Sequence, residues 1–219
     1  MATAWGTSIQ KRVLDVVASA FLLTLVLPLL PFIVLAIKLD SPGPIFYNAR
    51  RAGYRFRPLD VLKFRKMHVD ASGSPLTVAG DARFTRIGAF LARTHIDELP
   101  QLWNVLHGDM SIVGPRPEEE RFVAMHREAY TRILSVRPGI TGWTQLVYAD
   151  EIRLLASAPD PVSYYVETLL PDKVRIDQMY VDGARPTDDL KVLLWTPLVM
   201  VFGRRVIIDP VRSQLRLAS

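Results

Sequence analysis

The chain has 219 residues, 49% of them hydrophobic, and no cysteine. This length suits one catalytic unit, with or without a membrane element, and the missing cysteine excludes disulfides, thiolate zinc sites and cysteine nucleophiles. The 27 lysine and arginine residues outnumber the 22 aspartate and glutamate residues, so the expected partners are anionic: nucleic acid, lipid headgroups or phosphorylated metabolites.

The first predicted element is an apolar run at residues 16–37, which contains no charged residue and is long enough to cross a bilayer core of roughly 30 Å. No small-residue cleavage site follows, so a signal peptide is not expected. Pro28 and Pro31 interrupt the run, and interior prolines kink helices. Because basic residues flank both ends, the positive-inside rule does not orient a span. We therefore favour a re-entrant hairpin that enters and leaves by the cytosolic face, with a kinked single span as the alternative.

The next elements are shorter. The runs at residues 45–47 and 56–64, on either side of Gly53, predict a β-hairpin, and the small polar residues 70–81 predict a surface loop. A helix is predicted over residues 84–93, and another begins near Leu99 with Pro100 at its first position, where a missing N–H costs least. Residues 117–134 have helical spacing, and RPGITGW at residues 137–143 predicts a turn.

The C-terminal third is predicted to be helical in pieces. Residues 150–180 have breaks at SAPDP and LLP, because proline disfavours a helix interior. The apolar run at residues 190–202 is too short to span a membrane. It is either an interfacial helix, with Trp195, Arg204 and Arg205 as anchors, or a buried core helix.

Asp97 and Glu98, in "THIDELPQLW", are the first candidates for chemistry. Adjacent helical residues point about 100° apart, so these carboxylates do not form a shared-proton pair. One can act as a nucleophile towards phosphorus while the other holds Mg²⁺, a cation that binds through one or two carboxylates plus substrate phosphates. The alternative is a helix-start role, since acidic residues favour a helix N-terminus by about 0.3–1 kcal/mol.

Basic residues near this segment suggest a phosphorylated substrate. Arg116 lies between two prolines, and such a stiff turn favours bidentate phosphate contact. Further cations that can line an anionic cleft are Lys63, Arg65, Lys66, Arg93 and Arg137. His95 and His107 have no partner at metal-ligand spacing, so no zinc site is expected.

Several quoted segments together carry a resemblance to a known family. They are KRVLDVVAS, PLLPFIVLAIKLDSPGPIFYNARRAG, LKFRKM, RIGAFLARTHIDELPQLWNVLHGDMSIVGPRP, RPGITGW and DLKVLLWT. Over residues 11–196, the chain resembles the bacterial sugar transferases, the monotopic phosphoglycosyl transferases that begin polysaccharide and glycoconjugate assembly. Large members carry an extra multi-span region before this unit, so the chain is expected to be the minimal catalytic form.

The resemblance implies a reaction and roles for several residues. Members transfer a sugar-1-phosphate from a nucleotide diphosphate sugar, usually a UDP-sugar, to a polyprenol phosphate such as undecaprenyl phosphate, and release UMP. Asp97 matches the nucleophile that forms a phosphoglycosyl-aspartate, and Glu98 matches the carboxylate associated with Mg²⁺. Arg116 matches a phosphate-binding arginine. Lys63 and Arg93 match basic positions near the site, and Asp177 matches a later acidic position.

The chain also departs from the family pattern. Leu27 precedes Pro28 where members commonly have serine, and the usual glycine-arginine turn after GITGW is missing. The position of the helix break and the sugar are therefore not predicted.

We expect a mainly helical α+β fold with a small β-hairpin and a proline-broken, re-entrant membrane helix. Residues 1–40 form the membrane element and residues 41–219 the catalytic domain, which together make one unit at the cytosolic face of the bacterial inner membrane. The expected partners are a nucleotide sugar, a polyprenyl phosphate and membrane lipids, but not nucleic acid; a homodimer is left open. The competing hypotheses are an inactive membrane scaffold for glycosyltransferases and a basic nucleic-acid-binding protein.

Overall fold

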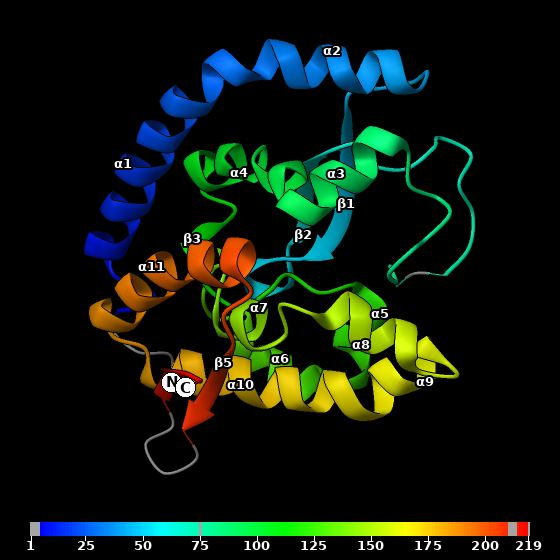
Figure 1. Cartoon of the computed structure of the whole chain (residues 1–219). Coiled ribbons are helices and arrows are strands. Elements are labelled where there is room, and N and C mark those ends of the chain that lie inside the picture. The colour runs from blue at the N-terminus through cyan, green and yellow to red at the C-terminus, as the bar shows by residue number, and fades with distance from the viewer. Residues whose placement is uncertain (1–4, 75, 210–213, 219) are drawn as a thin grey trace.

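Two apolar helices form the N-terminal part of the fold. The structure is a computed structural model that describes residues 5–74, 76–209 and 214–218; residues 1–4 of the expected membrane element, residue 75 of the expected loop, and residues 210–213 and 219 lie outside the described residues. Helix α1 (Ile9–Val26) leads through a 3₁₀ turn (Leu27–Leu29) into α2 (Leu30–Asp40). Figure 1 shows that α1 and α2 meet at a corner and form an arch beside the rest of the chain. Both prolines lie in the first turn of their elements, where a missing N–H costs least.

Both ends of this arch, α1 and α2, are attached to the rest of the chain. Near the start of α1, the Lys11 ammonium contacts the Asp189 carboxylate, and Asp15 accepts a hydrogen bond from Ile112 N at 3.0 Å. At the end of α2, Asp40 accepts a hydrogen bond from Ile87 N at 2.9 Å. The middle of the arch presents exposed apolar side chains, namely Phe21, Leu25, Leu27, Leu29, Phe32 and Leu35. It is one helical segment, Ile9–Asp40, that is long and apolar enough to cross a membrane by length and composition.

The predicted hairpin is confirmed. Strands β1 (Phe46–Ala52) and β2 (Pro58–Phe64) pair antiparallel, with Phe46 opposite Phe64 and Ala52 opposite Pro58. The two rings at the open end stack with their centroids 5.5 Å apart. Residues 70–81, apart from residue 75, form turns, bends and loop without helix or strand.

Helices α3 (Arg86–Thr94) and α4 (Gln101–His107) follow the loop. Thr85 caps α3 by accepting a hydrogen bond from Gly88 N at 2.9 Å. His95 then takes a left-handed conformation with φ 56°, and a 3₁₀ turn (Ile96–Glu98) leads to α4. Pro100 is the residue before α4 rather than its first residue. A single left-handed residue and a 3₁₀ turn thus separate α3 from α4.

The segment RPGITGW is not a simple turn, and that prediction is wrong. Its residues form strand β4 (Gly139–Thr141), which pairs parallel with β3 (Ser111–Val113). The two segments approach each other closely at glycine residues: a Cβ on Gly139 would lie 2.1 Å from Gly114 N. A three-residue parallel pairing between distant segments leaves no local periodicity to detect. Within the predicted helical stretch 117–134, α5 (Glu120–Met125) and α6 (Arg127–Ile133) meet at His126.

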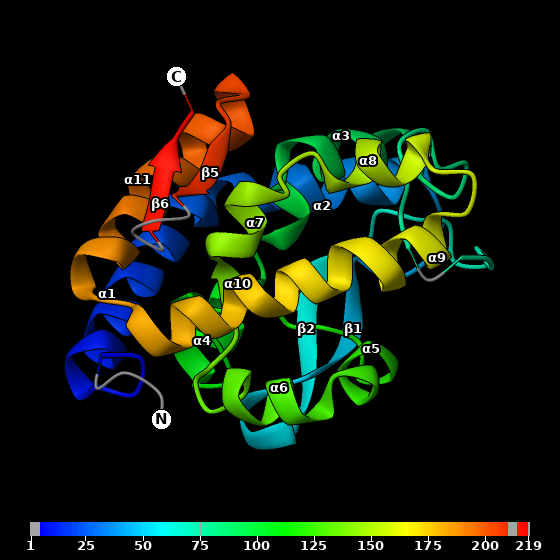
Figure 2. The same cartoon turned by 90° about the horizontal axis from the view of Figure 1, so that it is seen from below.

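Further along the chain, α7 (Trp143–Val147), α8 (Glu151–Ser157) and α9 (Pro161–Tyr164) precede a π-helical turn (Tyr165–Leu169) and α10 (Leu170–Gly183). The predicted break at SAPDP is confirmed, but the break at LLP is wrong. In the π-helical turn, Leu170 N donates a hydrogen bond to Tyr165 O. Pro171 then lies in the first turn of α10, so the helix continues. Figure 2 shows α10 crossing the molecule beside α6.

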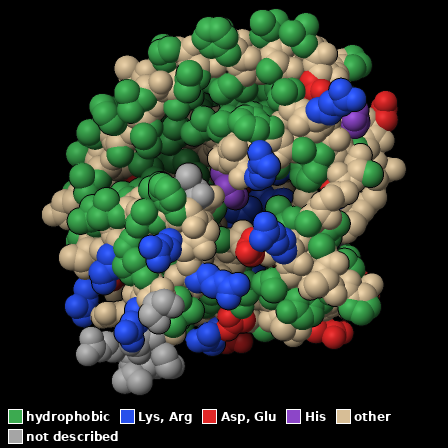
Figure 3. All heavy atoms as spheres, in the orientation of Figure 1, with side chains coloured by type: hydrophobic (Ala, Val, Ile, Leu, Met, Phe, Trp, Pro, Cys, Tyr) green, Lys and Arg blue, Asp and Glu red, His purple; other side chains and the backbone are tan. Residues whose placement is uncertain are grey.

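Helix α11 (Pro186–Phe202) has features of both predicted alternatives. Val192 and Val199 are buried in the core, whereas Leu190, Leu194 and Phe202 are exposed. Figure 3 shows apolar side chains along the arch of α1 and α2 and again over the region of α11. A second hairpin, β5 (Val206–Asp209) with β6 (Gln214–Leu217), was not predicted. The mainly helical class is confirmed, and the described residues form three two-stranded sheets rather than one.

Candidate active site

The carboxylate pair Asp97 and Glu98 lies in the 3₁₀ turn between α3 and α4. Asp97 is 1% exposed. A 3₁₀ helix has three residues per turn, so neighbouring side chains point about 120° apart. The two carboxylates accordingly contact different cations. The prediction that these side chains act separately rather than as a shared-proton pair stays consistent with this geometry.

Three cationic side chains surround the pair. Lys66 Nζ lies 2.8 Å from Asp97 Oδ2, and Lys63 Nζ donates to Glu98 Oε1 at 2.8 Å. Arg116 Nη2 lies 3.7 Å from the same Glu98 oxygen. Lys63 lies near the end of β2, and Arg116 follows β3. The end of the hairpin, the 3₁₀ turn and the segment after β3 therefore meet at this site. Three cations against two carboxylates give a site that suits a polyanionic ligand.

Burial and these charges set the protonation states. Burial raises the pKa of Glu98, but Lys63 and Arg116 outweigh this effect, and the pKa lies well below its usual range. Burial lowers the pKa of Lys63 in spite of Glu98, and it also lowers the pKa of His95. At neutral pH, Glu98 is therefore ionised and His95 is neutral.

The carboxylate pair fits Mg²⁺ only as a partial ligand set. Among the described residues, no group of three or more His, Cys, Asp or Glu side chains is arranged to hold a metal ion. Both cation contacts of Glu98 go to Oε1, which leaves Oε2 without a hydrogen bond to any described residue. One or two hard carboxylate oxygens completed by substrate phosphates are the set that Mg²⁺ uses in phosphoryl-transfer sites. The residues present thus fit the predicted cofactor.

The other predicted residues are placed in three different ways. Arg93 is exposed in the last turn of α3, and it forms no hydrogen bond or ion pair with the described part of the chain. Asp177 is buried on α10 and accepts a hydrogen bond from the Thr144 hydroxyl at 3.1 Å. Burial raises the pKa of Asp177 to about 7. Both positions stay candidates for substrate contact.

Arg137 and Arg65 are not brought to the carboxylate pair. Arg137 Nε donates to Gly108 O at 2.7 Å, at the C-terminal end of α4, whereas Glu98 lies before the N-terminal end of that helix. Arg65 donates to Ser41 O at 2.9 Å and to Pro44 O at 2.6 Å, so it fastens the end of α2. Each guanidinium thus contacts the carbonyl of a residue that caps the C-terminal end of a helix, Gly108 after α4 and Ser41 after α2.

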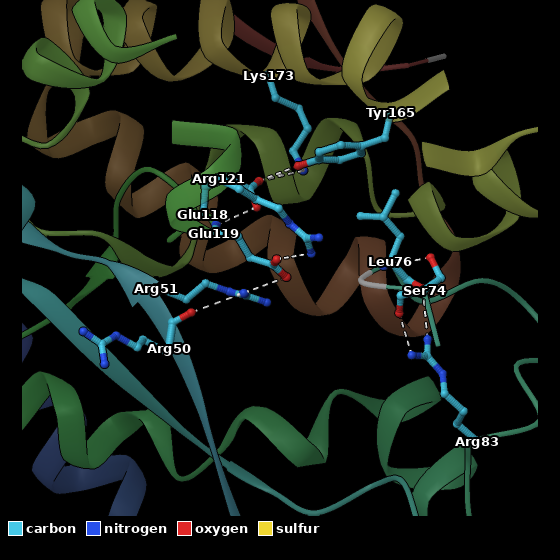
Figure 4. A network of polar contacts seen from close by, with 10 residues as sticks. All are labelled: Arg50, Arg51, Ser74, Leu76, Arg83, Glu118, Glu119, Arg121, Tyr165 and Lys173. Atoms are coloured by element: carbon cyan, nitrogen blue, oxygen red, sulfur yellow. Dashed lines mark hydrogen bonds and ion pairs between the residues drawn. The ribbon is translucent and has the colours of Figure 1, made fainter. Parts of the chain in front are cut away.

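A buried polar cluster beyond Arg116 was missed from the sequence. Lys173 Nζ donates to Glu151 Oε2 and to the Tyr165 hydroxyl, each at 3.0 Å, and lies 3.7 Å from Glu118 Oε2. The Tyr165 hydroxyl donates to Glu118. Figure 4 shows Tyr165, Lys173 and Glu118 converging, with Glu119 directed towards Arg51 and Arg121. The run of three glutamates after Arg116 was the available signal, but it reads as a solvated helix start.

Comparisons with known proteins agree with this arrangement. The family model described as bacterial sugar transferase matches residues 6–203. The chain is 40% identical over 196 residues to a UDP-glucose:undecaprenyl-phosphate glucose-1-phosphate transferase of Caulobacter vibrioides, covering 87% of this chain and 69% of the relative. It is 44% identical over 145 residues to the protein of the same name in Escherichia coli, covering 62% of this chain and 30% of that longer relative.

A third relative has a different sugar in its name. It is a UDP-N-acetylgalactosamine-undecaprenyl-phosphate N-acetylgalactosaminephosphotransferase of Aeromonas hydrophila, 41% identical over 154 residues, which cover 66% of this chain and 36% of the relative. The family match extends over most of the chain and includes the carboxylate pair, all three surrounding cations and both ends of the arch. The chain therefore belongs to the bacterial sugar transferase family.

Proposed function

We propose that this chain transfers a sugar-1-phosphate from a UDP-sugar to undecaprenyl phosphate and releases UMP, as the first membrane step of a polysaccharide or glycoconjugate pathway. The observation that carries the proposal is the buried Asp97 next to Glu98, with Lys63, Lys66 and Arg116 around them. The names of the relatives support the same reaction class. Because those names include glucose and N-acetylgalactosamine, they do not choose the donor.

The reaction has two displacements at one phosphorus atom. In the first, an Asp97 carboxylate oxygen forms a bond to the β-phosphorus of the donor, and the bond from this phosphorus to the bridging oxygen breaks. The bridging oxygen leaves on UMP with the electron pair. In the second, a phosphate oxygen of undecaprenyl phosphate attacks the same phosphorus and expels the Asp97 carboxylate. The products are undecaprenyl diphosphate sugar and free enzyme.

Charge and positioning supply most of the catalysis in such a transfer. Lys63 and Arg116, both in contact with Glu98 in the free protein, are proposed to hold phosphate oxygens, and the exposed Arg93 to receive the outer part of the diphosphate. Mg²⁺ held by Glu98 and the substrate phosphates would neutralise phosphate charge. His95 is neutral and does not add a further cation.

The arch supports insertion at one face of the membrane. Both of its ends are bonded to the catalytic body, and its exposed middle is apolar. A helix that spans the bilayer would instead separate its ends by about 30 Å, on opposite sides. We therefore propose a re-entrant element in the cytosolic leaflet of the inner membrane, where a water-soluble donor and a lipid acceptor meet.

Single cysteines test this topology without background, because the chain has none of its own. Thr7→Cys and Pro42→Cys flank the arch at exposed positions. In sealed spheroplasts, an impermeant maleimide added outside is expected to label neither variant, and lysis is expected to expose both. Labelling of one of the two from outside would establish a single span.

The reaction itself is tested by UMP release from a panel of UDP-sugars with undecaprenyl phosphate and Mg²⁺. We expect release with one donor and none detectable with Asp97→Asn, whose side chain has a similar shape but is not a nucleophile. Without the acceptor, the parent is expected to release one UMP per enzyme and to gain the mass of a hexose phosphate on the peptide with Asp97. Folded parent protein that releases no UMP with any donor would favour the scaffold hypothesis.

A further inference from the structure

The buried cluster beyond Arg116 depends on the π-helical turn. Side chains eight positions apart on an α-helix point about 80° apart, but one extra residue in a π turn leaves seven ordinary steps and reduces this to about 20°. The turn begins at Tyr165, eight residues before Lys173. It therefore sets the Tyr165 hydroxyl and the Lys173 ammonium on one face, where they lie 3.0 Å apart. π-helical turns of this kind are frequent at functional sites.

These two side chains contact Glu118, the residue that follows the arginine loop, residues 114–117. The loop is held at its beginning by the β3 and β4 pairing, where Gly139 N donates to Pro115 O at 2.8 Å. At its other end, Ala52 N donates to Glu118 O at 2.9 Å, and the Glu118 side chain accepts from Tyr165. Arg116 lies between these two attachments. The backbone and the side chain of Glu118 thus both help to fix the loop that carries Arg116.

Arg116 also lies in the field of two groups of carboxylates. Burial lowers its pKa, but Glu98, Glu151 and Glu118 outweigh this effect and raise it. Lys173 is 4% exposed and contacts both Glu151 and Glu118, so it neutralises two of the three carboxylates whose field reaches Arg116. The Glu118 and Glu151 side chains are partly buried, 12% and 25% exposed, and without that ammonium they would need another cation, since a charge left unpaired away from water is costly. Arg116 is the cation that their field already reaches.

We propose that Lys173, with Tyr165, is a positioning residue of the transfer reaction. Lys173 forms ion pairs with Glu118 and Glu151, so these carboxylates do not draw the Arg116 guanidinium away from the carboxylate pair Asp97 and Glu98. This inference rests on the proposed function. Lys173 itself does not contact the reacting phosphorus. Its effect on catalysis runs through the direction of Arg116.

The test compares matched variants of the full chain in detergent, with kcat and KM for UMP release measured over a range of pH. Lys173→Met is expected to lower kcat/KM by about 10- to 100-fold, the size of effect that misplacing one oriented group produces. Lys173→Arg is expected to retain most activity, and Tyr165→Phe to show a smaller loss. The control Arg175→Met removes an exposed cation from the same helix, two residues away, and is expected to stay within about twofold of the parent.

Two further measurements distinguish a loss of Arg116 positioning from a general disturbance of the fold. Burial raises the pKa of Glu118, but Lys173 and the Tyr165 hydrogen bond outweigh it and keep the pKa low. Without Lys173, this pKa rises, so the deficit of Lys173→Met should shrink as pH falls and Glu118 takes up a proton. Likewise, adding Glu118→Gln to Lys173→Met should restore most of kcat/KM. A deficit that is equal at every pH, together with no recovery in the double variant, would overturn the inference.

Unfolding of Lys173→Met and inactivity of the parent protein each call for a different comparison. If Lys173→Met does not fold, the double variant and Tyr165→Phe carry the same comparison, because neither leaves Glu118 ionised without a buried cation nearby. If the parent releases no UMP, the proposed function fails by itself. Calorimetric binding of UDP then decides: equal weakening in Lys173→Met and Arg116→Gln supports the positioning role, and binding unchanged in Lys173→Met overturns it.

Discussion

At the scale of single residues, two buried aspartates lie in different electrostatic surroundings. Asp97 has the Lys66 ammonium 2.8 Å away, whereas Asp177 accepts one hydrogen bond from the Thr144 hydroxyl and forms no ion pair with the described residues. Burial is the largest influence on Asp177 and raises its pKa to about 7. The carboxyl group of Asp177 is thus close to half protonated at neutral pH.

This raised pKa predicts a pH dependence of stability. The pKa of Asp177 is near its ordinary value of 3.8 in the unfolded chain and about 7 in the folded chain, so between these values the folded state binds more protons. Stability contributed by Asp177 is therefore fully present below pH 3.8 and is lost as pH rises towards 7, by up to about 4 kcal/mol. Asp177→Asn should flatten this part of the melting-temperature profile. An unchanged slope would contradict the burial argument.

At the scale of elements, the start of α1 is fastened by a buried charge. Asp189 on α11 accepts from Trp5 Nε1 at 2.8 Å and from the Tyr180 hydroxyl at 2.9 Å, and it contacts Lys11. The Tyr180 hydroxyl oxygen also lies 3.2 Å from Val113 O, at the end of β3. The cluster around Asp189 therefore contacts both the start of α1 and the end of β3, which leads into the arginine loop.

Breaking this cluster should be costly. Asp189→Asn leaves the Lys11 ammonium buried without its anion, so we expect a loss of about 3–5 kcal/mol in the free energy of unfolding in detergent. The matched control is Asp182→Asn, which removes an exposed ion pair with Arg132 and should cost no more than about 1 kcal/mol. Similar losses in the two variants would show that the buried cluster does not stabilise the arch.

The contact between β3 and β4 leads to a second prediction about elements. An added methyl group in Gly139→Ala would lie 2.1 Å from Gly114 N and 2.7 Å from Gly114 Cα, so the strands must separate and the arginine loop must shift. UMP release should fall by at least about tenfold. Gly183→Ala is the control, since a Cβ there meets nothing within 4 Å, and helix propensity should make that variant as stable as the parent or more so. Full activity in Gly139→Ala would refute the proposed link.

At the scale of the whole molecule, the apolar arch and the candidate active site are adjacent. The arch presents an exposed apolar middle, and its ends are bonded near α3 and β3, the elements that lead to the carboxylate pair and to Arg116. Figure 3 shows charged side chains beside the apolar region in the same view. This arrangement supports a catalytic site at the membrane surface.

The arch should dominate membrane binding. Leu25→Glu with Phe32→Glu adds two carboxylates to its exposed middle, and a charge within the bilayer costs about 2.5–3.5 kcal/mol. We expect the double variant to leave the membrane fraction in a vesicle flotation assay. Met125→Glu, an equally exposed apolar position on α5, should remain bound. Retention of the double variant on vesicles would mean that α11 or lipid headgroup contacts hold the protein.

Much of the site followed from local sequence. The acidic pair before a proline-marked helix start, and the arginine between prolines, are short-range features whose stiffness is independent of the rest of the fold. The assignment of cations was less accurate, because charge alone does not distinguish Lys63, which reaches Glu98, from Arg137, which holds the end of α4. That choice depends on which helix ends and strands become neighbours.

Contiguous residues were enough to predict the apolar N-terminal helices, the first hairpin and the family, because hydrophobic length, β-pattern and motif chemistry are properties of neighbouring residues. The folded chain was needed to see that RPGITGW contains a strand, that the helix continues through Pro171, and that Glu118, Tyr165 and Lys173 meet. These features depend on hydrogen bonds and charges between segments that are distant in sequence, and local propensity carries no information about such partners.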